Sequence, residues 1–169
     1  IPLLEGTSDI YSYNQSLLFA SKNNWNPRPI FQSYSAYNQK LLQINASHLT
    51  SLNAPDNIFF SLEPIDGRLP TLDDGNSLPI LLANYKYEYL NEGFIFLKKL
   101  KNPKSRQEIS LQKRTYKLGD FIEVPQSEKP VFIRMNLKPS LIGRIVTVLF
   151  KPTQLNITIS LYNEQKNNY

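Results

Sequence analysis

Along the first hundred residues, short apolar runs alternate with segments in which apolar residues recur at helical spacing. The stretch from Asn14 to Lys22 favours a short helix. A second helix is predicted from Ser35, a good N-cap residue, to about Thr50. Between these ends, apolar residues recur every three or four positions from Tyr37 to His48, which is typical of an amphipathic helix.

The same half of the chain contains continuous apolar runs of strand length. Asn57 to Glu63 has an uninterrupted apolar centre, which indicates a strand buried on both faces. Ile30 to Tyr34 also favours a strand, and Leu78 to Asn84 a short helix. Tyr85 to Leu90 and Phe94 to Leu100 predict a hairpin whose turn holds a glycine. Alternating strands and helices predict a small α/β layer.

After residue 107 the pattern changes to short runs separated by proline and glycine, which favours an antiparallel sheet or sandwich. The predicted strands are Glu108–Lys117, Asp120–Val124, Val131–Leu137, Arg144–Phe150 and Leu155–Tyr162. We therefore predict an α+β fold with an α/β subdomain at residues 1–100. A basic linker at 101–107 and an antiparallel β subdomain at 108–169 complete it.

The amino-acid composition argues against several kinds of functional site. The chain has no cysteine and one histidine, His48, so disulfides, thiolate nucleophiles and zinc or non-haem iron sites are not expected. Asp66, Asp73 and Asp74 share one predicted loop, with Glu63 before it. Such carboxylates could bind Mg²⁺ or Ca²⁺ or serve a glycosidase, but they lack the spacing of a calcium-binding loop. We predict no metal and no cofactor.

Positive charge is concentrated in one segment. Residues Lys98–Lys117 hold eight lysines and arginines against one acidic residue, whereas residues 1–97 are net acidic. Such a segment is either a solvated connector or a contact with anionic lipid headgroups. Tyr116 is its only aromatic residue, so it lacks the interleaved aromatics of a nucleic-acid platform, and we predict no nucleic-acid partner.

A serine-hydrolase triad is the first catalytic candidate, because Ser33 or Ser35, His48 and Asp66 supply its residue types. Neither serine lies in a G-x-S-x-G elbow, and His48 lies in the apolar face of the predicted helix. No catalytic residue is therefore assigned.

The segment 28–37 concentrates hydrogen-bonding side chains where the predicted strand meets the predicted helix. Unpaired backbone N–H groups at a helix start suit an anionic ligand. The predicted ligand-binding residues here are Arg28, Gln32, Ser33, Tyr34 and Tyr37. The alternative is that the two serines only cap the helix while the tyrosines pack.

Asp66 and Arg68 flank Gly67 where the buried strand ends. Together they can form a clamp for a carboxylate, a phosphate or a sugar hydroxyl. The alternative is an intramolecular ion pair that only holds the loop. Both residues join the predicted ligand-binding set.

The string Arg28–Tyr37, with Asn45, His48-Leu49, Ala54-Pro55 and Ile65–Pro70, resembles a known arrangement. It is similar to the extracytoplasmic domain of an uncharacterised family of bacterial polytopic membrane proteins. That family is similar in layout to multi-span glycosyltransferases that use lipid-linked sugars. The resemblance implies a membrane-tethered parent and a periplasmic location, and it supplies no catalytic residues.

These observations predict a non-catalytic binding or support module near the membrane, with a glycan, a lipid-linked sugar or a protein as partner. The alternative is a hydrolase or glycosyltransferase accessory domain with its site at residues 28–37, Asp66 and Arg68. No apolar run reaches the roughly 18 residues that cross a bilayer. Because the chain opens at Ile1 rather than methionine, we expect a piece of a longer protein whose spans lie upstream.

Overall fold

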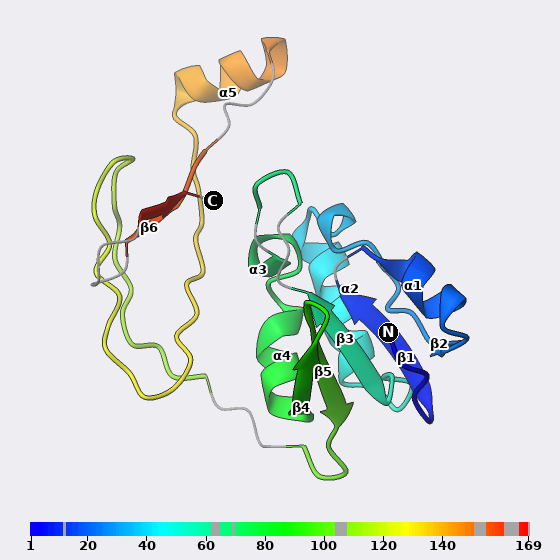
Figure 1. Cartoon of the computed structure of the whole chain (residues 1–169). Coiled ribbons are helices and arrows are strands. Elements are labelled where there is room, and N and C mark those ends of the chain that lie inside the picture. Colours follow the sequence, from blue (N-terminus) through cyan, green and yellow to red (C-terminus); the bar gives the residue numbers. More distant parts are fainter. Residues whose placement is uncertain are drawn as a thin grey trace. The chain divides into compact units, whose positions relative to one another are not determined.

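The computed structural model describes residues 1–11, 13–61, 65–68, 70–103, 108–150, 155–160 and 166–168. The chain divides into two units, Ile1–Arg106 and Gln107–Asn168, which are described separately (Figure 1). Helices and a mixed five-stranded sheet confirm the predicted α+β class.

The sheet of the first unit has the strand order β2-β1-β3-β5-β4. Its strands are β1 (Thr7–Tyr11), β2 (Asn24–Trp25), β3 (Asn57–Ser61), β4 (Tyr85–Asn91) and β5 (Phe94–Lys99). β1 runs parallel to both β2 and β3, whereas β5 runs antiparallel to β3 and β4. The carboxyl ends of β1 and β3 therefore meet at one edge of the sheet.

Helices cover both faces of this sheet (Figure 1). α1 (Gln15–Ala20) contributes to one core, and α2 (Gln39–Leu49) and α4 (Ser77–Asn84) contribute to the other. Alternate residues of β3 enter the two cores, and all five are buried, as the apolar run predicted. The α1 side contains Ile10, Leu18, Phe59, Phe94 and Phe96. The opposite side contains Tyr11, Ala46, Leu49, Ile58, Phe60, Ile80, Leu81 and Tyr85.

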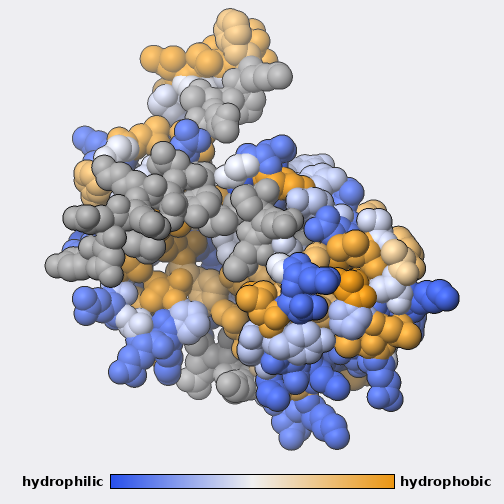
Figure 2. Space-filling model, in the orientation of Figure 1, coloured by the Kyte–Doolittle hydropathy of each residue, from blue (hydrophilic) through white to orange (hydrophobic). Residues whose placement is uncertain are grey.

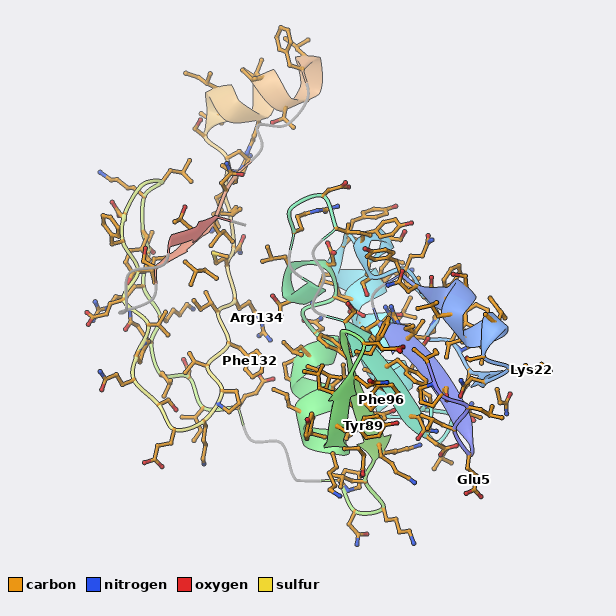
Figure 3. The ribbon with its side chains drawn as sticks, viewed as in Figure 1. Glu5, Lys22, Tyr89, Phe96, Phe132 and Arg134 are labelled. Atoms are coloured by element: carbon orange, nitrogen blue, oxygen red, sulfur yellow. The ribbon has the colours of Figure 1, made fainter. Side chains whose placement is uncertain are left out.

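The predicted β4–β5 hairpin is confirmed. Its turn residues Glu92 and Gly93 have φ of 49° and 80°, the left-handed geometry that tight hairpin turns need. Tyr89 and Phe96 face each other across the two strands, with ring centroids 4.3 Å apart (Figure 3). This stacking extends the core to the edge strand.

Two predictions for the segment before α2 are wrong. Residues 30–34 form no strand, and Ser33–Ser35 form a 3₁₀ turn, η1. The side chain of Asn45 takes both backbone groups of Ile30, its amide N–H at 2.8 Å and its carbonyl at 3.0 Å, so neither can join a sheet ladder. Asn38, rather than Ser35, caps α2 by accepting from the N–H of Leu41 at 3.0 Å.

In the second unit, the structure corrects the predicted series of strands. No strand forms at 108–117, 120–124 or 131–137, and most of 144–150 belongs to helix α5 (Leu141–Leu149). The described strands there are an antiparallel pair, β6 (Thr158–Ser160) and β7 (Lys166–Asn168); β6 lies inside the predicted 155–162 strand, of which 161 and 162 are outside the described residues.

The physical reason for this difference is the lack of a core. Among the described residues 108–150 and 155–160, no residue is buried, so the alternating pattern had no apolar layer to pack against. α5 is instead supported locally, because Ser140 caps it by accepting from the N–H of Gly143 at 3.1 Å. Among the described residues, no helix has the length and apolar character needed to cross a bilayer.

Candidate functional site

A pocket of about 380 Å³ is formed by segments that follow β1, β2 and β3. Its described lining is Tyr13, Gln32, Tyr34, Ile65 and Asp66. Chain segments after β1 and β3 lead to helices on opposite faces of the sheet. Ligands of α/β sheets usually bind at such a divergence.

A tight turn carries the acidic residue of this pocket. Ile65 and Arg68 exchange backbone hydrogen bonds of 3.1 and 2.7 Å, which leaves Asp66 and Gly67 as the turn residues. Their φ values are 48° and 72°, a conformation that glycine and aspartate tolerate better than most residues. The Asp-Gly pair therefore determines how the Asp66 carboxylate is presented.

A fully buried guanidinium, that of Arg28, contacts Ser33, which lies between the pocket residues Gln32 and Tyr34 in the chain. Arg28 Nη1 donates to Asp9 Oδ2 and to the carbonyl of Ile10, both at 2.8 Å. Its Nη2 donates to Ser33 Oγ at 3.0 Å. Arg28 thus ties strand β1 to η1, the turn that carries Tyr34 and begins next to Gln32.

Two further residues contact the guanidinium, and a third residue binds one of them. Tyr11 lies under it, with Arg28 Cζ 3.5 Å from the ring centroid, a cation–π contact. Asp74 Oδ2 is 3.9 Å from Arg28 Nε and accepts a hydrogen bond of 3.0 Å from Asn45 Nδ2. Asn45 also holds Ile30, so a single buried network joins β1, η1, α2 and the start of α4. We call Asp9, Tyr11, Arg28, Ser33, Asn45 and Asp74 the buried polar network.

Electrostatic interactions favour the charged form of the Arg28 guanidinium, which lies at the centre of this network. Burial alone would lower the pKa of the Arg28 guanidinium, but Asp9, Tyr11 and Asp74 raise it above its ordinary value. Burial raises the pKa of Asp74, although Arg28, Asn45 and the Ser77 hydroxyl oppose that rise. Burial likewise raises the pKa of Tyr11. Two carboxylates, those of Asp9 and Asp74, thus share one guanidinium.

The structure brings three of the predicted ligand-binding residues together in the pocket, namely Gln32, Tyr34 and Asp66. Arg28 and Ser33 are not part of the described pocket lining, and both residues are 0% exposed. The sequence predicted that these two side chains contact a ligand directly. Their complete burial does not support that contact. Their geometry instead makes them positioning residues for η1.

The other two predicted residues lie outside the described pocket lining. Tyr37 is 82% exposed and precedes α2. Arg68 pairs with Asp73, at 3.6 Å between Nη1 and Oδ1, so its ion pair is with Asp73 rather than with Asp66. The two residues of the predicted clamp therefore have separate surroundings. Asp66 lines the pocket, and Arg68 forms an ion pair within the chain.

The triad considered from the sequence does not assemble as a nucleophilic site. Ser33 Oγ accepts from Arg28, and His48 lies on α2, where burial lowers its pKa. Within the described residues, no group of three histidine or acidic side chains could hold a metal ion.

Sequence reasoning missed Asp9, Tyr13, Asn45, Ile65 and Asp74 as site residues. Asp9 carried a usable signal, since an acid within an apolar strand is rarely buried without a partner. Asn45 also interrupts the apolar face of its helix. Nothing local marked Tyr13 or Ile65, because only the sheet brings segments after β1 and β3 together.

A larger hollow, of about 560 Å³, lies along α2. Its described lining, from Gln39 to Ser47, belongs to one helix, so it is an open face without convergent groups. In the basic segment, Lys99 Nζ donates to the carbonyl of Ala54 at 2.8 Å, whereas Lys98, Lys113, Arg114 and Lys117 are exposed. Residues 104–107 of that segment lie outside the described residues.

Comparisons of the chain with protein-family models, with curated proteins and with solved structures find no match. Function is therefore inferred from the geometry of the pocket and of the buried polar network.

Proposed function

We propose that the first unit is a non-catalytic binding module whose pocket takes a glycan. The observation that carries this proposal is the convergence of Gln32, Tyr34 and Asp66, from two separate segments, on one pocket with Tyr13. A carboxylate and an amide are suited to pairs of sugar hydroxyls, and two tyrosines offer ring faces and further hydroxyls. The pocket volume of about 380 Å³ is in the range of small-ligand sites.

The chemistry of the pocket favours binding over hydrolysis. Glycosidases use two carboxyl groups that flank the scissile bond. The described pocket lining contains one, Asp66. The nearby Asp73 carboxylate is engaged by Arg68, and Asp74 belongs to the buried polar network. The resemblance noted in the sequence leads us to propose a periplasmic setting, with the glycan of a lipid-linked sugar as the ligand class.

The test is calorimetric titration of the full chain with a panel of bacterial mono- and oligosaccharides. Asp66→Asn keeps a residue that tolerates the left-handed turn and removes the charge. We expect it to weaken glycan binding roughly tenfold or more, the effect of losing a charge-assisted hydrogen bond.

Glu5→Gln is the matched control, because Glu5 is an exposed acid outside the pocket (Figure 3). It should leave the affinity unchanged, and both variants should keep the melting temperature of the parent. The proposal fails if no sugar binds, or if the two variants weaken binding equally.

A further inference from the structure

Helix α5 of the second unit exposes nearly all of its aliphatic side chains. Leu141, Ile142, Ile145, Val148 and Leu149 are between 61% and 86% exposed. Figure 2 shows the surface over α5 as mostly hydrophobic. Monomeric soluble proteins rarely leave a contiguous apolar face of this kind uncovered, so it marks an interaction site.

The apolar residues occupy one side of the helix. At 100° per residue, the six aliphatic side chains of α5 fall within an arc of about 160°. Gly143, Arg144 and Thr147 lie on the other side, where Thr147 Oγ1 donates to the carbonyl of Gly143 at 2.7 Å. The helix is therefore amphipathic, with a cation, Arg144, on its polar face.

The sequence on both sides of this helix is basic. Residues 129–163 contain five lysines and arginines and no acidic residue, and of these Arg134 pairs with Glu108, at 4.0 Å between Nη2 and Oε2. A second copy of the chain would bring an identical basic segment, and like charges brought together oppose such a pairing. An anionic surface with an apolar interior complements both the positive charge of this segment and the apolar face of α5.

We propose that α5 lies in the interface of an anionic lipid bilayer, with its aliphatic face among the acyl chains and Arg144 at the phosphate level. Nine residues of helix extend only about 14 Å, far short of the roughly 30 Å hydrocarbon core, so the helix lies along the surface and does not span it. Amphipathic helices with basic polar faces bind membranes in this manner. This inference is independent of the glycan pocket, because it uses residues of the second unit alone.

The test is vesicle flotation of the full chain, with phosphatidylcholine vesicles containing phosphatidylglycerol and with phosphatidylcholine vesicles alone. We expect flotation with the anionic vesicles, weakened by high salt. Val148→Asp and Thr147→Asp are a matched pair, since the two parent side chains have the same shape and both variants add one negative charge.

Val148→Asp should lower the partition coefficient by more than about tenfold, because it places a charge in the apolar face. Thr147→Asp should lower it by less than about threefold, since only the attraction between charges is weakened. Both should retain the melting temperature of the parent.

Equal losses for the two variants would overturn the proposal, because charge alone would then explain binding. So would equal flotation with neutral vesicles, or none with either. Sedimentation velocity tests the remaining possibility, that the apolar face of α5 binds a second copy of the chain. A parent dimer that Val148→Asp dissociates would show that the face is a dimer interface. A fall in the melting temperature for Val148→Asp alone would assign it to packing within the chain, and either result rejects the lipid surface.

Discussion

Arg28 and Asp9 form an ion pair of 2.8 Å between Nη1 and Oδ2 in which neither side chain is exposed. The backbone N–H of Arg28 also donates to the same carboxylate oxygen at 3.2 Å. Through its second nitrogen the guanidinium holds Ser33, and so the turn that carries Tyr34. The proposed glycan pocket therefore depends on a charge pair whose two side chains are fully buried.

Removing the guanidinium should destabilise the first unit strongly. Arg28→Ala leaves the Asp9 carboxylate buried without its cation, and we expect a loss of about 3–5 kcal/mol in the free energy of unfolding. Urea denaturation followed by the fluorescence of Trp25 measures it.

The double variant Asp9→Asn with Arg28→Met is the control for this charge effect. It removes both ions, so it should be less destabilised than Arg28→Ala alone. A double variant at least as unstable as the single would show that packing, and not the charge left behind, accounts for the loss.

Asn45 should matter more than an exposed asparagine of the same helix. Asn45→Ala leaves the N–H and carbonyl of Ile30 without their described side-chain partners, and a loss of about 2–3 kcal/mol is expected. Asn38→Ala, which removes the exposed cap of α2, should cost about 1 kcal/mol. Chemical denaturation of both variants compares them, and equal losses would contradict the clamping role of Asn45.

The raised pKa of Asp74 predicts a dependence of stability on pH. The folded state binds the Asp74 proton more tightly than the unfolded chain does. This group's contribution therefore falls as pH rises from about 4, the ordinary carboxyl range, through the raised pKa. In Asp74→Asn this group does not titrate, so the variant does not lose stability in this way as pH rises. The melting temperature of the variant minus that of the parent should therefore increase with pH. A difference that is constant between about pH 4 and about pH 7 would contradict the assignment.

Gly6 and Gly93 both have positive φ, at 87° and 80°, but their surroundings differ. A Cβ at Gly6 would lie 2.6 Å from Asp56 Oδ2, whereas nothing lies within 4 Å of one at Gly93. Asp56 Oδ2 accepts from the N–H and the hydroxyl of Thr7 at 2.8 and 3.0 Å, so it cannot move away freely.

Alanine at Gly93 should therefore cost about 1–2 kcal/mol from backbone strain alone. Alanine at Gly6 should cost about 1 kcal/mol more, from the weakened Asp56 bonds. Thermal denaturation of both variants measures the difference, and a Gly6→Ala variant as stable as Gly93→Ala would show that Asp56 adjusts without loss.

The elements that periodicity predicted well are those whose stabilising contacts are simple. β3, α1, α4 and the β4–β5 hairpin formed as expected, because burial on both faces, helical spacing and a glycine turn each favour one structure. Residues 30–34 failed because their strand-like composition was overridden by the side chain of Asn45, fifteen positions away. Four of the five predicted strands of the second unit failed because no residue of the described stretches 108–150 and 155–160 is buried.

Part of the candidate site could be predicted from local sequence patterns. Gln32, Tyr34 and Asp66 were identified as polar groups next to apolar segments, and the pocket brings them together. Arg28 was predicted to bind a ligand, but its complete burial could not be inferred. That burial depends on Asp9 and Asp74, which are 19 and 46 positions away along the chain.

The amino-acid sequence by itself determined which segments are apolar, where the turns lie, and that cysteine and clustered histidine chemistry are absent. These are properties of neighbouring residues, and short-range spacing is enough to express them. Only the tertiary structure decided that Arg28 is a buried positioning residue, that Arg68 pairs with Asp73 rather than Asp66, and that Tyr13 joins the pocket. The parallel pairing of β1 with β3 brings segments some fifty residues apart to one edge of the sheet, and a local pattern carries no information about that pairing.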